Sequence, residues 1–271
     1  MVTDQALADS HIHLFAHGFV GPEGHSPAGG DELSEYEKLR QRVGIDTALV
    51  VGYEGEAAYE GNNAYLERMA RRHSWIKPLA YLHHSATHSE AQEWLDAGFY
   101  GVSVYAVEEN DAESLADLIR KVGPVLAERR AVMSLNAAPA VYPALRAALE
   151  DQPGLHALIS HFGLPAKGAG SEHEAIQGLR DLGAMQENAN VVVKASGFYA
   201  FSGLLDADEA LAMVLENFGA ERIVWGSDYP VVLSSESFDQ TIRYVSELSE
   251  GVRRAILGDN LRAILARVER P

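Results

Sequence analysis

Three polar residues alternate near the start of the chain, where Asp9, His11 and His13 are separated by Ser10 and Ile12. Because successive side chains of a strand point to opposite faces, a strand here would project all three polar groups to one side. A buried carboxylate and two buried imidazoles are costly unless they are hydrogen-bonded, paired or bound to a metal. The spacing therefore predicts a catalytic or metal site. A pair of ordinary, hydrogen-bonded core histidines is the alternative.

A second acidic group follows the last expected strand, in the segment Trp225–Pro230, which reads Trp-Gly-Ser-Asp-Tyr-Pro. If the first and last strands are neighbours in a closed barrel, Asp228 lies beside His11 and His13 despite their separation in sequence. An aspartate that only caps the turn before Pro230 is the alternative, because such turns are common.

Two further candidates follow later strands: His161 comes after the sixth, and Lys194 stands at the end of the seventh, two residues before Ser196. A lysine that emerges from a run of valines either extends outward or faces a pocket, and we expect the pocket. His83 and His84 close the third strand, and a surface position is the alternative for both of them.

Short apolar runs alternate with segments of helical periodicity along the whole chain. Two of the runs, 48–51 and 191–193, are continuously apolar, which is typical of parallel strands covered on both faces. The expected strands are Leu7–His13, Asp46–Gly52, Ile76–Leu82, Gly101–Tyr105, Ala131–Leu135, Leu155–Ser160, Val191–Ala195 and Arg222–Ser227. The expected helices include Asn63–His73, Ser89–Ala97, Ala112–Glu128, Val141–Leu149, Glu172–Gln186, Asp208–Phe218 and Ser237–Ser249.

This alternation is compatible with a closed barrel or with an open, doubly wound sheet. The chain has 271 residues, the length of a typical (β/α)8 barrel, and no Gly-x-Gly-x-x-Gly turn follows the first strand. We therefore predict one α/β domain over residues 1–271, a (β/α)8 TIM barrel with its site at the C-terminal ends of the strands. The loops Ala16–Glu32 and Gly163–Ser171 would lie at that face as a lid or rim, or as tolerated insertions.

The composition excludes several classes of function. A net charge of −17 argues against nucleic acid as a partner, and the absence of cysteine excludes disulfides, thiolate nucleophiles and iron–sulfur clusters. No apolar run approaches the roughly 20 residues needed to cross a bilayer, and no signal peptide is visible. We expect a cytoplasmic protein with a small-molecule partner and no membrane partner, and the composition leaves homo-oligomer formation open.

Five motifs in order resemble the second amidohydrolase family, whose members include sugar lactonases, pyrone-dicarboxylate lactonase and non-oxidative aromatic decarboxylases. The resemblance runs from residue 7 to residue 265 and implies a TIM-barrel hydrolase. The matching segments are Asp9–His13, Ser160–Pro165, Lys194–Gly197, Trp225–Pro230 and Gly258–Leu265.

The chain also departs from that family's pattern. Asn136 stands at the end of the fifth strand, where metal-dependent members carry a histidine, and Val231 follows the Trp225–Pro230 turn, where a histidine is common. Pyrone-dicarboxylate lactonase grips its substrate with arginines, and none is present at the end of strand four or in Phe162–Lys167. A dicarboxylate substrate is therefore disfavoured.

The resemblance implies hydrolysis of a small carbonyl compound, most simply a lactone, with Asp228 as the general base and His161 orienting the substrate. The developing oxyanion would be stabilised by one divalent metal, zinc in the first place, on His11, His13 and Asp228, or by protonated histidine and Lys194. Asp9 is expected to support the site. Since Asn136 cannot replace an imidazole, we expect weak or partial metal occupancy.

The remaining site assignments are secondary. Asn136 and Ser196 are expected to support the site, and Tyr105 and His83 to contact the substrate. Two other functions stay open: a non-oxidative decarboxylase on the same scaffold, and a catalytically silent barrel. The intact set of polar residues argues against the silent barrel; it comprises Asp9, His11, His13, His161 and Asp228.

Overall fold

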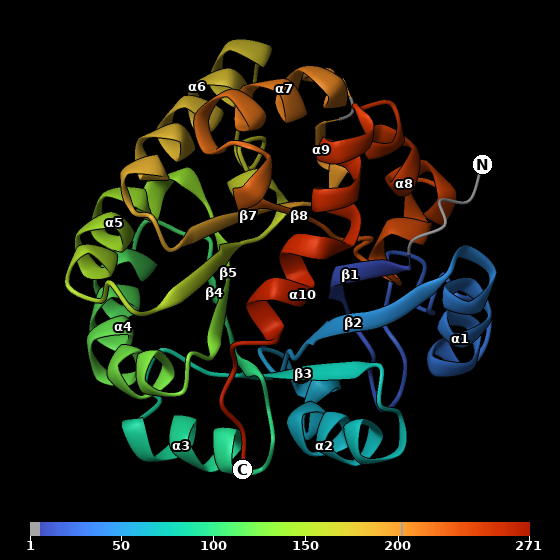
Figure 1. Cartoon of the computed structure of the whole chain (residues 1–271), viewed down its shortest axis with the longest axis vertical. Coiled ribbons are helices and arrows are strands. Elements are labelled where there is room, and N and C mark those ends of the chain that lie inside the picture. Colours follow the sequence, from blue (N-terminus) through green and yellow to red (C-terminus); the bar gives the residue numbers. More distant parts are fainter. Residues whose placement is uncertain (1–5, 202) are drawn as a thin grey trace.

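The computed structural model describes residues 6–201 and 203–271. Eight parallel strands form one sheet in sequence order, with helices around the outside (Figure 1). The predicted (β/α)8 barrel is thus confirmed. The strands are β1 (Leu7–Ile12), β2 (Ile45–Val51), β3 (Ile76–Tyr81), β4 (Gly101–Ala106), β5 (Val132–Ala137), β6 (His156–Ile159), β7 (Val191–Ala195) and β8 (Ile223–Trp225).

The helices expected from the sequence agree with the structure to within a few residues. The sequence analysis assigned no helix to residues 250–254, and none before Asn63. There the structure has α1, which begins after Asp31, whose side chain accepts the backbone N–H of Ser34 as an N-cap. The helices are α1 (Glu32–Val43), α2 (Asn62–Arg72), α3 (His88–Asp96), α4 (Asp111–Glu128), α5 (Tyr142–Glu150), α6 (Glu172–Gly183), α7 (Ala207–Phe218), α8 (Phe238–Ser246), α9 (Glu250–Arg254) and α10 (Asn260–Leu265). None of those in the described residues is long and apolar enough to span a bilayer.

The barrel closes between β1 and the segment just after β8. The backbone N–H of His13 donates to the carbonyl oxygen of Tyr229 at 2.6 Å, and that of Asp228 donates to the carbonyl oxygen of His11 at 2.8 Å. An isolated parallel bridge pairs Ile12 with Tyr229. The residues that close the barrel are therefore those in which the sequence predicted the site.

Two layers of apolar side chains hold these strands. One layer lies between the strands and the surrounding helices, and the other fills the inside of the barrel. Helix α10 covers the N-terminal ends of the strands, and Leu261, Ile264 and Leu265 belong to the inner layer. Figure 1 shows α10 across the ring of strands. With that end covered, substrate access is expected at the opposite, C-terminal end.

Candidate active site

Three buried side chains meet at the barrel's seam. The Nε2 atoms of His11 and His13 are 3.1 Å apart, and they lie 3.6 Å and 3.7 Å respectively from Oδ1 of Asp228. His11 is fully buried, while His13 and Asp228 are 6% and 2% exposed. Barrel closure thus joins residues from the two ends of the chain in one site.

Asp9 does not project with the two histidines, contrary to the expectation from simple alternation. It pairs with Ala48, and Ile12 pairs with Val50, so β1 has three steps where β2 has two. Ala48, Val50 and Ile12 all belong to the outer layer. The irregularity between Asp9 and Ile12 is a bulge, and it changes which side chains face the barrel interior.

The carboxylate of Asp9 instead supports the seam from outside. It accepts the hydroxyl of Tyr36 on α1 at 3.1 Å and the backbone N–H groups of Ser227 at 2.9 Å and His11 at 3.1 Å. Burial raises the pKa of Asp9 to about 6, and these hydrogen bonds oppose that shift. Asp9 therefore ties the strand that carries the histidines to the segment that carries Asp228.

The orientation of each imidazole is fixed by its second nitrogen. Nδ1 of His13 is 2.8 Å from the carbonyl oxygen of Val51, which can only accept, so the proton is on Nδ1 and the Nε2 lone pair faces the site. Nδ1 of His11 lies 3.3 Å from Oγ of Ser160 and 3.2 Å from Nζ of Lys194. The Nε2 atoms of both rings thus face Asp228.

The geometry fits a metal ion. The ligand atoms of His11, His13 and Asp228 all lie within 4.8 Å of one another. Ligands of tetrahedral zinc, at 2.0–2.1 Å from the ion, are separated from each other by roughly 3.3 Å. The three observed separations bracket that value, and two imidazoles with one carboxylate form a donor set that zinc accepts. The triad can therefore hold one divalent ion.

His161 completes this face of the site. Its Nε2 lies 4.0 Å from Oδ1 of Asp228, and its ring centroid is 4.5 Å from that of His11. Oγ of Ser196 accepts the backbone N–H of His161 at 3.2 Å and lies 3.0 Å from its Nδ1. Both His161 and Asp228 have left-handed backbone conformations, with φ of 54° and 60°. Such strain in non-glycine residues clusters at functional sites.

Lys194 faces the barrel interior and does not extend outward. It is fully buried, and its Nζ donates to Oγ of Ser134 at 2.6 Å. Burial lowers its pKa to about 7, while the carboxylates of Asp9 and Asp228 oppose this shift. A lysine in this position can change its charge near neutral pH.

Burial also shifts the other titratable groups of the site. It raises the pKa of Asp228 to about 7, a shift that the hydrogen bond from Tyr199 opposes. It lowers the pKa of His13 to about 4, that of His161 to about 3, and that of His11 well below its ordinary value. The three histidines are therefore neutral at neutral pH, which is the form that binds metals.

Tyr199 is a site residue that the sequence analysis missed. It lies on a short 3₁₀ helix after β7, η5 (Phe198–Phe201), and its hydroxyl donates to Oδ2 of Asp228 at 2.6 Å. Oδ1 is thereby left to face the Nε2 atoms of the two histidines. Its position, just after the Lys194–Gly197 motif, was the signal that could have identified it.

The predicted substrate-binding residues differ in their surroundings. Tyr105 is partly buried and pairs in register with Asn136, whose buried Oδ1 has no hydrogen-bond partner among the described residues. His83 is exposed, and Nδ1 of its ring contacts Oγ of Ser85. No contact joins His83 to the triad in the described part of the chain, so its role stays a prediction.

The loop after β1 is anchored by a buried carboxylate. Glu32 accepts the backbone N–H groups of Phe15 and Phe19 and the hydroxyl of Ser26. The loop is therefore hydrogen-bonded to the first residue of α1. This anchoring suits a rim of the site better than a loosely held insertion.

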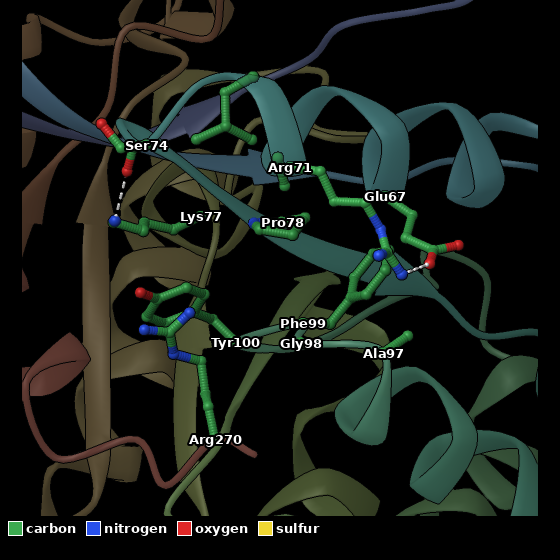
Figure 2. A pocket seen from close by; sticks show the side chains of 12 residues that line it. Glu67, Arg71, Ser74, Lys77, Pro78, Ala97, Gly98, Phe99, Tyr100 and Arg270 are labelled. Carbon is green, nitrogen blue, oxygen red and sulfur yellow. Dashed lines mark hydrogen bonds and ion pairs between the residues drawn. The ribbon is translucent and has the colours of Figure 1, made fainter.

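A separate cavity of about 310 Å³ lies at the other end of the barrel (Figure 2). Lys77 at the start of β3, Tyr100 just before β4 and Arg270 line it. None of its lining residues belongs to the triad or contacts it in the described residues. We assign the chemistry to the C-terminal end.

Comparison with known proteins agrees with this geometry. Residues 8–267 match the family model described as Amidohydrolase. A curated relative, L-fucono-1,5-lactonase of Burkholderia ambifaria, is 33% identical over 97 residues. That alignment covers only 34% of this chain and 32% of the relative.

Three solved structures share the fold at low sequence identity, and each alignment covers 97% of this chain. The first is a probable 2-pyrone-4,6-dicarboxylic acid hydrolase from Acinetobacter baumannii (17% identical, all of that chain covered, TM-score 0.73). The second is an amidohydrolase from Burkholderia multivorans with bound zinc (19%, 99% covered, TM-score 0.69). The third is a 2,6-dihydroxybenzoate decarboxylase from Rhizobium (16%, 99% covered, TM-score 0.67).

Proposed function

Because the chain belongs to the amidohydrolase family, we propose that it is a hydrolase that opens a lactone by attack of water on the ring carbonyl. The observation that carries this proposal is the buried triad, in which Oδ1 of Asp228 lies within 3.7 Å of both histidine Nε2 atoms. A carboxylate beside two neutral imidazoles suits the deprotonation of a water molecule.

Asp228 is the proposed general base. Its pKa near 7 matches the requirement that a base be partly ionised and still basic at neutral pH. Tyr199 holds Oδ2, so Oδ1 accepts the proton of the attacking water. As the carbonyl re-forms, the ring C–O bond breaks and the proton passes to the departing ring oxygen. The product is a hydroxy acid.

His161 is the proposed hydrogen-bond donor to the substrate. Oγ of Ser196 accepts the backbone N–H of His161, which leaves the hydroxyl proton of Ser196 for Nδ1. Nε2 of His161 then carries the ring proton and can donate it to the carbonyl or leaving oxygen. In this proposal Ser196 supports the site through His161 and does not contact the triad.

We propose zinc as the bound ion, held by His11, His13 and Asp228. When bound, a divalent ion supplies Lewis acidity to the carbonyl and lowers the pKa of a coordinated water. Two nitrogen donors and one oxygen donor suit zinc better than magnesium or calcium, which prefer oxygen ligands. The zinc-containing Burkholderia multivorans structure supports this choice through its shared fold.

Decarboxylation is the second candidate, supported by the similar fold of the Rhizobium decarboxylase. One experiment separates the two. The purified protein is incubated with a panel of γ- and δ-lactones while proton release is followed, and with hydroxybenzoates while carbon dioxide is measured. Proton release that depends on Asp228 supports the lactonase. Carbon dioxide release without lactone opening would replace it with the decarboxylase.

A further inference from the structure

Three tyrosines lie at the C-terminal ends of three neighbouring strands, β2, β3 and β4. Tyr53 follows β2, Tyr81 ends β3 and Tyr105 stands near the end of β4. Their ring centroids are 4.7 Å apart for Tyr53 and Tyr105, 5.5 Å for Tyr53 and Tyr81, and 6.0 Å for Tyr81 and Tyr105. All three side chains are partly exposed. We call this cluster the tyrosine wall.

The strand register places the wall on the inner face of the barrel. Val51 and Leu79 are paired neighbours in the inner layer, and Tyr53 and Tyr81 follow them by two residues each. Because side chains of a strand alternate, these rings continue the inner face toward the C-terminal end. Tyr105 lies two residues beyond Ser103, the register partner of Tyr81.

The wall lies close to the proposed base and carries unused hydrogen-bonding groups. Burial raises the pKa of Tyr105, and the nearby carboxylate of Asp228 raises it further. Its register partner Asn136 has a buried Oδ1 without a partner, and the hydroxyl of Tyr81 has no hydrogen bond among the described residues. A buried polar atom without a partner is rare, so a ligand or water that completes it is expected.

The charges around the wall disfavour an anion. The hydroxyl of Tyr53 donates to Glu56 at 3.1 Å, and the carboxylate of Glu54 raises the pKa of Tyr81 beyond the effect of burial. In the described part of the chain, no lysine or arginine makes a cation–π contact with any of the three rings. The buried cation, Lys194, is already bonded to Ser134.

We propose that Tyr53, Tyr81 and Tyr105 determine substrate specificity by binding a neutral lactone ring that carries hydroxyl groups, with Asn136 beside them. Aromatic faces pack against the C–H face of such a ring, while tyrosine hydroxyls and the amide bond its hydroxyls. A substrate carboxylate placed against the wall would be repelled by the carboxylates of Glu54 and Glu56. This inference rests on the proposed lactonase function for its kinetic test.

The kinetic test compares three compounds that each contain a six-membered lactone ring. D-Glucono-1,5-lactone carries hydroxyls, δ-valerolactone has none, and 2-pyrone-4,6-dicarboxylate carries two carboxylates. We expect the hydroxylated lactone to have the highest kcat/KM. Tyr81→Phe and Tyr105→Phe, which keep the ring and the packing, should each raise KM for it on the order of tenfold and leave δ-valerolactone unchanged.

Tyr100→Phe is the matched control. Tyr100 lines the separate cavity (Figure 2) just before β4, whereas Tyr105 lies near the other end of that strand. The control should change neither substrate. Equal turnover of the two neutral lactones, a preference for the dicarboxylate, or Phe variants with unchanged KM would each overturn the assignment of the wall.

A binding measurement separates this inference from the proposed function. D-Gluconolactam and valerolactam are titrated calorimetrically into the wild-type protein and the two wall variants. Tighter binding of the hydroxylated lactam, weakened about tenfold in Tyr105→Phe, supports the wall even if no lactone is hydrolysed. Equal binding of both lactams refutes the wall even if a lactone is opened.

Discussion

The backbone N–H of Asp228 donates to the carbonyl oxygen of His11 at 2.8 Å, while the side chains of the same two residues lie 3.6 Å apart. One pair of residues thus closes the barrel through its main chain and forms the site through its side chains. Any change that opens the seam will also separate the triad, so stability and activity are coupled here.

Asp228→Asn should keep the fold and lower kcat by about 10²–10⁴-fold, because it removes the base and keeps its size. The measurement is steady-state kinetics on the best lactone, with circular dichroism to check folding. Asp239→Asn, which changes an exposed partner of Arg42, is the control and should retain full activity. Near-wild-type turnover in Asp228→Asn would show that another group accepts the proton of the attacking water.

Tyr199→Phe should lower kcat on the order of tenfold with little effect on KM. The variant leaves Oδ2 of Asp228 without its 2.6 Å donor, so the carboxylate loses its fixed orientation. Tyr244→Phe, which removes a hydroxyl bonded to Glu236, is the matched control. Equal effects of the two substitutions would show that Tyr199 has only a packing role.

Metal content should be substoichiometric as purified and should fall further on dialysis with a chelator, because the set has no third strong imidazole ligand. Elemental analysis of the protein measures this directly. Zinc added at 100 times its Kd should stabilise the fold by roughly 2.7 kcal/mol. His13→Asn should abolish that stabilisation, whereas His83→Asn should not. One ion per chain that resists the chelator would show that Asn136 does not weaken the site.

The unfolding temperature of the chelator-treated protein should depend on pH through Asp228. Its pKa is raised by burial to about 7, so the folded state binds this proton more tightly than the unfolded state does. This contribution to stability is present below the ordinary carboxyl pKa and is lost as pH rises through about 7. Asp228→Asn should therefore gain stability relative to wild type between pH ~5 and ~8. Thermal scans at both values test the sign, and a constant difference would contradict the shift.

Gly226→Ala should destabilise the protein by about 1–3 kcal/mol and reduce activity. A Cβ at this position would lie 2.7 Å from Cβ of His11 and 3.0 Å from its backbone nitrogen, so the strand that carries the ligand must move. Gly251→Ala in α9 is the control, since its Cβ would meet nothing within 4 Å and alanine favours helix. Chemical denaturation compares the two variants, and equal midpoints would contradict the predicted clash.

Much of this architecture could be predicted because strand and helix patterns are local. Strands β2 and β7 contain continuous apolar runs, and closure of the predicted barrel required β1 and β8 to meet. The bulge after Asp9 could not be predicted, because Asp9, Ser10 and His11 are all polar and the change of face between them leaves no visible break in the pattern. Alternation alone therefore put Asp9 on the wrong face.

Tyr199 escaped prediction for a related reason. Its contact with Asp228 depends on the path of the 3₁₀ turn after β7, which no periodicity describes. The wall formed by Tyr53, Tyr81 and Tyr105 likewise depends on strand register, of which the sequence analysis identified only Tyr105. Local patterns specify the strands, and tertiary packing decides which of their ends share a surface.

The seam also decides when the protein can first act during its synthesis. His11 and His13 are synthesised with the first strand, whereas Asp228 and the Tyr229 carbonyl that pairs with His13 follow the last of the eight strands. Until then the nascent chain carries two imidazoles and no carboxylate partner for them at the seam. A growing chain therefore cannot assemble the triad before the segment that follows the last strand reaches the first strand.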